Sequence, residues 1–261
     1  MLIVTWNVNS LAARADFVAL FLDEVRPDVL CIQELKLETE KVPQELFASR
    51  GYATAIFGQK SWNGVLIASK TPLADVTTGL VPADQGESRL ISATTSGPGG
   101  MPLRVINVYC PQGQSVDSDK FPYKLGFYDG LDAWLRATHT PDQALVLVGD
   151  LNVAPHEDDI WDPVGMSKWP SFHPEEHRRF QRLMDFGLVD AVKPHIPPKT
   201  YSFWDYRAGA FHKGWGMRID HILVTAPVVP HVAEAWISRE WRKKKKDLTP
   251  SDHAPVGVVL K

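Results

Sequence analysis

The chain has 261 residues, of which 44% are hydrophobic and 23% charged, the ordinary mixture of a water-soluble globular protein. This composition excludes disordered and fibrous classes, and a chain of this length buries a core large enough to fold without disulfides. Lysine and arginine number 28 against 31 acidic residues, a net charge of −3. The charge of the whole molecule therefore would not attract a polyanion, and any polyanion site must be a local patch.

The two cysteines, Cys31 and Cys110, lie inside apolar runs, so we expect buried free thiols rather than a disulfide or a metal site. No apolar run approaches the roughly 18 residues that a membrane span needs. The first residues, MLIVTWNVNS, lack the basic region and cleavage site of a signal peptide. We therefore expect a cytoplasmic protein without a membrane partner.

Strand-like and helix-like patterns alternate along the first half of the chain. Ser10 is a candidate helix cap, and Pro27 ends the helical spacing of apolar residues that follows it. The predicted elements are a strand at 2–6, a helix from Ser10 to Arg26, a strand at 29–33, a helix at about 38–49, and strands at 54–57, 64–68, 73–78 and 90–95. We expect the last four strands to be antiparallel.

The second half repeats the order of the first: strand, helix, strand, carboxylate. Glu34 and Asp150 each follow an apolar strand, at the edge where α/β sheets gather ligands; the alternative is two unrelated turn residues. The predicted elements are strands at 103–109 and 144–149 around a helix at 121–137, a loop at 154–173, a helix at 175–185, and strands at 219–225, 232–237 and 254–260. Since no segment reads as a linker, we predict one domain over residues 1–261.

Asp150 and Asn152 form the strongest local motif, Val-Gly-Asp-Leu-Asn. A carboxylate and a carboxamide two residues apart can share one side of a turn, where the first takes a proton or holds a metal and the second donates to an oxyanion. An Asx turn that merely closes the strand is the alternative.

Asp252 and His253 precede the last strand and offer a hard oxygen ligand and a titratable imidazole. Asp220 lies in an apolar run and must find a partner or lose solvation energy. An imidazole is the natural partner, and we favour His253 over His221. The alternative for Asp252 and His253 is a turn with a solvated histidine.

Asn7 and Tyr109 end equivalent strands in the two halves and complete a ring of polar groups at strand ends. Hard oxygen ligands without a Cys or His cluster favour Mg²⁺, or Mn²⁺, over structural zinc. A phenol and carboxylates beside such an ion suggest phosphoryl chemistry.

Six ordered motifs then carry a resemblance that covers essentially the whole chain. They are TWNVNS (Thr5 to Ser10), IQELK (Ile32 to Lys36), NVYCPQG (Asn107 to Gly113), GDLNVAP (Gly149 to Pro155), MRIDHIL (Met217 to Leu223) and SDHAPV (Ser251 to Val256). The sequence resembles the exonuclease III family of the endonuclease/exonuclease/phosphatase superfamily. The resemblance implies a deoxyribonuclease I-like fold, a four-layered α/β sandwich of two packed mixed sheets flanked by helices.

The resemblance also implies roles for the ring residues. Glu34 would be the principal metal carboxylate, Asp150 would orient or deprotonate the attacking water, and His253 would contact the phosphate. The metal set is Asn7, Glu34, Asp150, Asn152 and Asp252; the catalytic set is Tyr109, Asp150, Asn152, Asp220 and His253; the pocket for a baseless sugar is Phe203, Met217 and Ile219. Met217 departs from members that have an aromatic residue at that position, which leaves the preference of the pocket open.

A basic run, ISREWRKKKK, lies shortly before the SDH motif, with tryptophans interleaved. Its cations could neutralise phosphates beside the site, whereas a solvated loop is the alternative. The predicted DNA-binding residues are Arg239, Arg242, Lys243, Lys244, Lys245 and Lys246, with Arg89, Lys120 and Lys124 as weaker candidates.

We therefore predict a Mg²⁺-dependent DNA-repair nuclease, monomeric and nucleoid-associated when active, that cleaves duplex DNA at abasic sites and processes 3′ ends. The 3′-end activities would be a 3′-5′ exonuclease and a 3′-phosphatase. The alternatives are a catalytically silent nucleic-acid-binding regulator on the same scaffold and a superfamily phosphatase of small phosphoesters.

Overall fold

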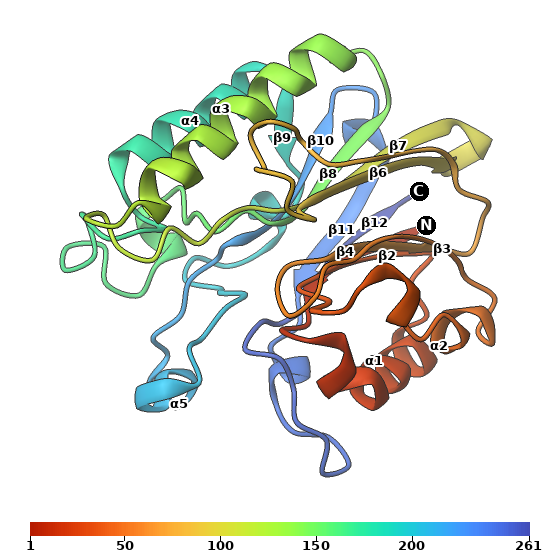
Figure 1. Cartoon of the computed structure of the whole chain (residues 1–261), viewed down its shortest axis with the longest axis horizontal. Helices are drawn as coiled ribbons and strands as arrows, with labels where there is room; N and C mark the ends of the chain where they lie inside the picture. The colour runs from red at the N-terminus through yellow and green to blue at the C-terminus, as the bar shows by residue number, and fades with distance from the viewer.

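The computed structural model describes all residues 1–261 and has four layers (Figure 1). Two six-stranded sheets pack face to face in the middle, and helices cover the outer face of each. The predicted fold class, a four-layered α/β sandwich with two mixed sheets, is confirmed.

The first sheet has the strand order β11-β12-β1-β2-β4-β3. Its strands are β1 (Leu2–Asn7), β2 (Val29–Gln33), β3 (Ala53–Phe57), β4 (Val65–Ser69), β11 (Val232–Ile237) and β12 (Val256–Leu260). β1 and β2 are parallel, whereas the other neighbours are antiparallel. The last strand, β12, therefore lies beside β1, which brings the SDH motif next to Asn7.

The second sheet has the order β5-β6-β7-β8-β10-β9. Its strands are β5 (Ala74–Thr78), β6 (Leu90–Ser96), β7 (Pro102–Tyr109), β8 (Leu145–Asp150), β9 (Leu188–Asp190) and β10 (Asp220–Thr225). Only β7 and β8 are parallel. Each sheet thus has one parallel pair at its centre, as the repeated strand-helix-strand pattern predicts.

Helices α1 (Leu11–Val25) and α2 (Glu45–Ala48) cover the first sheet, and α3 (Lys120–Thr138) and α4 (Pro174–Asp185) cover the second. A short helix, α5 (Ala210–Lys213), projects on a loop from the body (Figure 1). Ser10 caps α1 by accepting a hydrogen bond from the Ala13 amide, and a capping box between His173 and Glu176 begins α4.

Three apolar clusters hold the layers together. The largest has 20 buried residues and joins the two inner sheet faces, for example Ile3 of β1 with Val146 of β8. The other two join each sheet to its helices, through Phe21 of α1 on one side and Phe127 of α3 on the other. Because the apolar faces meet along their whole length, polar side chains that point inward gather at the strand ends.

Most strand boundaries agree with the prediction, but the helix predicted at 38–49 was wrong and one short strand was missed. The predicted helix at 38–49 is interrupted by Pro43, which separates a 3-10 turn at Thr39–Lys41 from the four-residue α2. The four strands after it are antiparallel as predicted, β3 with β4 and β5 with β6, and the two pairs belong to different sheets. β9 was missed because its three residues give too short a pattern. The loop at 154–173 is present, with one turn at Glu157–Asp159.

Both cysteines are buried and free, as predicted. None of the helices combines the length and the apolar character needed to cross a membrane.

Candidate active site

Three polar residues of the second sheet stand side by side because of strand register. Tyr109 of β7 pairs with Asp150 of β8, and Asp150 pairs with Asp220 of β10. Residues paired across neighbouring strands project to the same face. The register alone therefore places a phenol and two carboxylates in a row at one end of the sheet.

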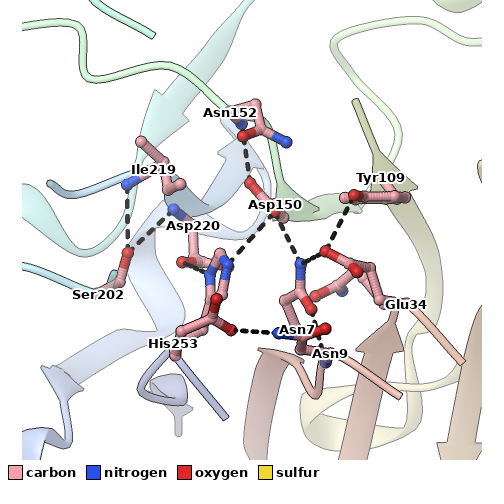
Figure 2. A network of polar contacts seen from close by, with 12 residues as sticks. Asn7, Asn9, Glu34, Tyr109, Asp150, Asn152, Ser202, Ile219, Asp220 and His253 are labelled. Carbon is pink, nitrogen blue, oxygen red and sulfur yellow. Dashed lines mark hydrogen bonds and ion pairs between the residues drawn. The ribbon is translucent and has the colours of Figure 1, made fainter. Parts of the chain in front are cut away.

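The first sheet contributes Asn7 and Glu34 to the same place. Asn7 ends β1, and Glu34 follows β2 with φ 56°, a left-handed conformation that is uncommon for glutamate and often found at functional sites. The Asn7 amide donates to Glu34 Oε1 at 2.7 Å and to Asp150 Oδ2 at 2.9 Å. Asn7 therefore connects the carboxylates of the two sheets (Figure 2).

Tyr109 closes the ring by donating from its hydroxyl to Glu34 Oε1 at 2.9 Å. Burial, together with the charges of Glu34 and Asp150, raises the pKa of Tyr109 well above its usual value, so the phenol stays protonated. Burial favours the neutral form of Glu34, but Lys36 and Asn7 outweigh it and hold the pKa of this carboxyl below its usual value.

His253 lies against Asp220, as predicted, with 2.9 Å between Nδ1 and Asp220 Oδ2 (Figure 2). Its other nitrogen, Nε2, lies 3.8 Å from Asp150 Oδ2. Burial opposes the charged imidazolium, but the carboxylates of Asp220 and Asp150 outweigh burial and raise the pKa of His253 to about 10. The imidazole is therefore a cation at neutral pH. His221 contacts Arg218 and the Val153 carbonyl instead.

Asn152 is fixed on the far side of Asp150. The backbone of Asn152 is left-handed, with φ 52°. Its backbone N–H donates to Asp150 Oδ1 at 2.9 Å, and its side-chain amide donates to the Cys110 carbonyl. The Asx turn considered as an alternative is thus present, and it orients the carboxylate of Asp150 as well as closing the strand. Burial raises the pKa of Asp150 above its usual value.

The predicted pocket residues lie at the same cavity, which has a volume of about 540 Å³. Phe203, Met217 and Ile219 line it together with Glu34 and Asp252. The Phe203 ring lies 4.8 Å from the His253 ring, between centroids, and the backbones of Phe203 and Met217 form a bridge. An apolar wall therefore adjoins the polar ring.

The sequence profile of the Endonuclease/Exonuclease/phosphatase family matches residues 4–253. The chain belongs to this family. Exodeoxyribonuclease III of Haemophilus influenzae is 34% identical, with 100% of both chains covered.

Two solved structures are similar to this chain over its whole length. A 3′ phosphatase from Neisseria bound to a product DNA hairpin is 38% identical, with TM-score 0.90 and coverage of 100% of this chain and 99% of that one. An AP endonuclease from Archaeoglobus fulgidus is 36% identical, with TM-score 0.91 and the same coverage. This family member is therefore a hydrolytic nuclease of the exonuclease III type.

Sequence reasoning missed two residues that complete the nuclease site. Lys36 Nζ lies 2.9 Å from Glu34 Oε2 and 2.5 Å from Asn9 Oδ1, and the Asn9 amide donates to Asp252 Oδ1 at 3.0 Å. Asn9 and Lys36 lie two residues beyond Asn7 and Glu34, so the motifs TWNVNS and IQELK contained the signal.

The charges of the nuclease site fit a divalent cation. Four carboxyl groups, Glu34, Asp150, Asp220 and Asp252, gather around two cations, Lys36 and His253, so acidic groups outnumber basic ones. The buried Asp220 Oδ1 has no hydrogen-bond partner. Oxygen donors and an excess of negative charge suit Mg²⁺ or Mn²⁺. Atoms of Asp150, Asp220 and His253 lie within 4.8 Å of one another, but Asp220 already binds His253.

The basic run divides into two parts. Arg242 is only 7% exposed, because its guanidinium packs on the Tyr206 ring and donates to the Trp204 carbonyl. Arg239 likewise lies over the Phe211 ring. The two arginines therefore hold the loop that carries α5. Lys243, Lys244 and Lys246 are exposed, and Lys245 lies over the ring of Trp241, which belongs to the core.

Of the three weaker candidates for DNA contacts, two line a surface hollow and one is buried. Arg89 and Lys120 line a hollow of about 600 Å³ beside Tyr109, together with Trp62, which is 69% exposed. Lys124 was wrongly expected as a DNA contact, since its side chain is completely buried. The reason is that Lys124 points from α3 toward α4 and the loops after β7 and β8, where it meets Glu176 and the carbonyls of Gln112 and Asn152.

Proposed function

We propose that this nuclease binds duplex DNA, hydrolyses phosphodiesters at abasic sites and processes 3′ ends as a 3′-5′ exonuclease and 3′-phosphatase. The observation that carries the proposal is one cavity in which the polar ring adjoins the apolar wall of Phe203, Met217 and Ile219. A flipped sugar without its base fits such a wall, while its phosphate faces the ring. The relatives named as a 3′ phosphatase and an AP endonuclease support both activities.

The residues of the ring divide the work of hydrolysis. Asp150 accepts the proton of the attacking water, and its raised pKa makes the carboxylate a stronger base. The water oxygen then bonds to phosphorus as the bond from phosphorus to the ester oxygen breaks, and the departing oxygen takes a proton from solvent. The imidazolium of His253, held by Asp220, donates to a non-bridging phosphate oxygen, and Asn152 orients Asp150 through its backbone.

We propose that Mg²⁺, with Mn²⁺ as a substitute, is held by Glu34 and Asp252 with the amides Asn7 and Asn152 and the carboxylate of Asp150. When bound, the ion neutralises charge that develops on the phosphate. Lys36 and Asn9 hold Glu34 and Asp252 from behind, which keeps the carboxylates in place.

The DNA would extend from the hollow at Arg89, Lys120 and Trp62 across the cavity to the lysines of the basic run. Lys120 and the lysines of the basic run supply the local positive charge that the net charge of −3 lacks, whereas the guanidinium of Arg89 is already paired with Glu87. Since one chain carries the whole ring, we propose that the nuclease acts as a monomer.

The test is a series of labelled duplexes that carry an abasic site, a 3′-phosphate or a plain recessed 3′ end, each with Mg²⁺ and with chelator. We expect cleavage of all three, fastest at the abasic site. Binding without cleavage of any duplex would favour the silent regulator. Hydrolysis of a soluble phosphomonoester without cleavage of DNA would favour the small-phosphoester phosphatase.

A further inference from the structure

Lys124 of α3 and Glu176 of α4 form an ion pair in which both side chains are completely buried. Removing two charges from water is costly, so a buried pair persists only where further hydrogen bonds satisfy it. Here they do. Lys124 Nζ also donates to the Asn152 carbonyl at 2.6 Å and to the Gln112 carbonyl at 3.2 Å, which uses its three donors.

Glu176 is satisfied in the same way. Its Oε1 accepts from the Ser171 backbone N–H at 3.0 Å, and its Oε2 accepts from the His173 backbone N–H at 3.0 Å. Gly113 allows the lysine stem to pass, since a Cβ at this position would lie 3.1 Å from Lys124 Cδ.

The backbone groups that this pair binds belong to three different loops. Gln112 follows β7, Asn152 follows β8, and Ser171 precedes α4. All three residues line the active-site cavity. One buried ion pair therefore holds three walls of the cavity from behind.

We propose that Lys124 and Glu176 are positioning residues for the hydrolytic reaction, an inference that rests on the proposed function. They fix the loops so that Asn152, and through it Asp150, stays aligned with the phosphate. Neither residue touches the substrate. Displacement of a catalytic group by about 1 Å costs on the order of 100-fold in rate, which makes such support important.

The test replaces the pair by Lys124→Met with Glu176→Gln, which leaves no unpaired buried charge. The matched control is Asp132→Asn with Arg182→Met, because that pair also joins α3 to α4, at 2.6 Å, and Asp132 lies about two turns of α3 beyond Lys124, outside the cavity lining. We expect kcat on the abasic duplex to fall by about 10- to 100-fold in the first variant, with KM changed less than about threefold. The control should change neither by more than about twofold.

A double-mutant cycle separates positioning from general loosening. In an Asp150→Asn background, removal of the pair should lower kcat by less than about threefold further, because the carboxylate whose alignment depends on the pair is already absent. Full additivity, or an equal loss in the control, would overturn the proposal.

Hydrogen exchange gives a readout that does not depend on activity. In the unmodified protein the amides of Ser171 and His173 should exchange slowly although they lie in a loop, and unprotected exchange there would overturn the proposal even if the variant fails to fold. In the folded variant, exchange should quicken in residues 110–116, 150–156 and 168–174. If the unmodified protein cleaves no DNA, the proposed function fails while the exchange data still test the pair.

Discussion

His253 Nδ1 lies 2.9 Å from Asp220 Oδ2, although the two residues are 33 positions apart and belong to segments of different sheets. This contact joins the two sheets at the site and keeps the imidazole charged. Because Asp220 and Asp150 raise the pKa of His253 from its ordinary 6.5 to about 10, the ion pairs stabilise the fold fully below pH 6.5 and lose this contribution as pH rises through 10.

Asp220→Asn should therefore lower the pKa of His253 toward its ordinary value and lower turnover by about 100-fold. The titration is followed by NMR of the imidazole in the metal-free protein, with His231, which binds the Lys261 carbonyl outside the site, as the internal reference. An unchanged His253 titration would contradict the assignment of Asp220 as its partner.

Asp150→Asn should lower turnover by at least about 1000-fold, because the variant amide cannot accept the proton of water. Affinity for the abasic duplex should change little, since the residue acts on the nucleophile and not on the duplex. Anisotropy titrations measure binding and single-turnover assays measure the rate, with the exposed Asp185→Asn as control. A parallel loss of binding would show that Asp150 holds the substrate.

Removal of the divalent ion should lower incision by at least about 1000-fold, because the excess negative charge of the ring then repels the phosphate. Glu34→Gln should raise the Mg²⁺ concentration for half-maximal rate by at least about tenfold. The control is Glu38→Gln, since Glu38 pairs with Lys41 outside the ring, and this change should leave the Mg²⁺ concentration for half-maximal rate unchanged. Full incision in excess chelator would refute the requirement.

Replacement of Lys243, Lys244, Lys245 and Lys246 with alanine should weaken binding to all duplexes. The slope of log affinity against log salt should flatten by about 0.9 for each phosphate that the protein no longer neutralises. Arg178→Ala, an exposed cation of α4, is the control. If the salt slope stays the same, the lysines form only a solvated loop.

Phe203→Ala should lower abasic incision but raise the ratio of cleavage at base-bearing nucleotides to cleavage at abasic sites. A smaller wall relaxes the steric limit on a base, while only the baseless sugar loses a good fit. The ratio is measured as kcat/KM on matched duplexes, with Phe211→Ala, which lies outside the cavity, as control. Equal losses of both activities would make Phe203 an ordinary core residue.

Most of the helices and strands, and the polar residues at the strand ends, could be predicted from the sequence. The periodicity of apolar residues is a local property of the sequence, so it predicted the strand-helix-strand repeats. The carboxylates that follow these strands could then be identified from their positions. Asp150 and Glu34 were found this way, and the need of a buried carboxylate for a partner predicted the contact of Asp220 with His253.

The tertiary structure alone decided which polar groups meet and which cations reach solvent. The Asn9 amide supports Asp252 across 243 residues, and although Asn9 lies within the TWNVNS motif, nothing local to it identifies Asp252 as its partner. Lys124 and Arg242 read as exposed cations, yet both are buried. The direction of a long side chain depends on which layer covers its helix or loop. Packing of distant segments, and not local periodicity, therefore determines whether a charged group is exposed to water or paired with a buried partner.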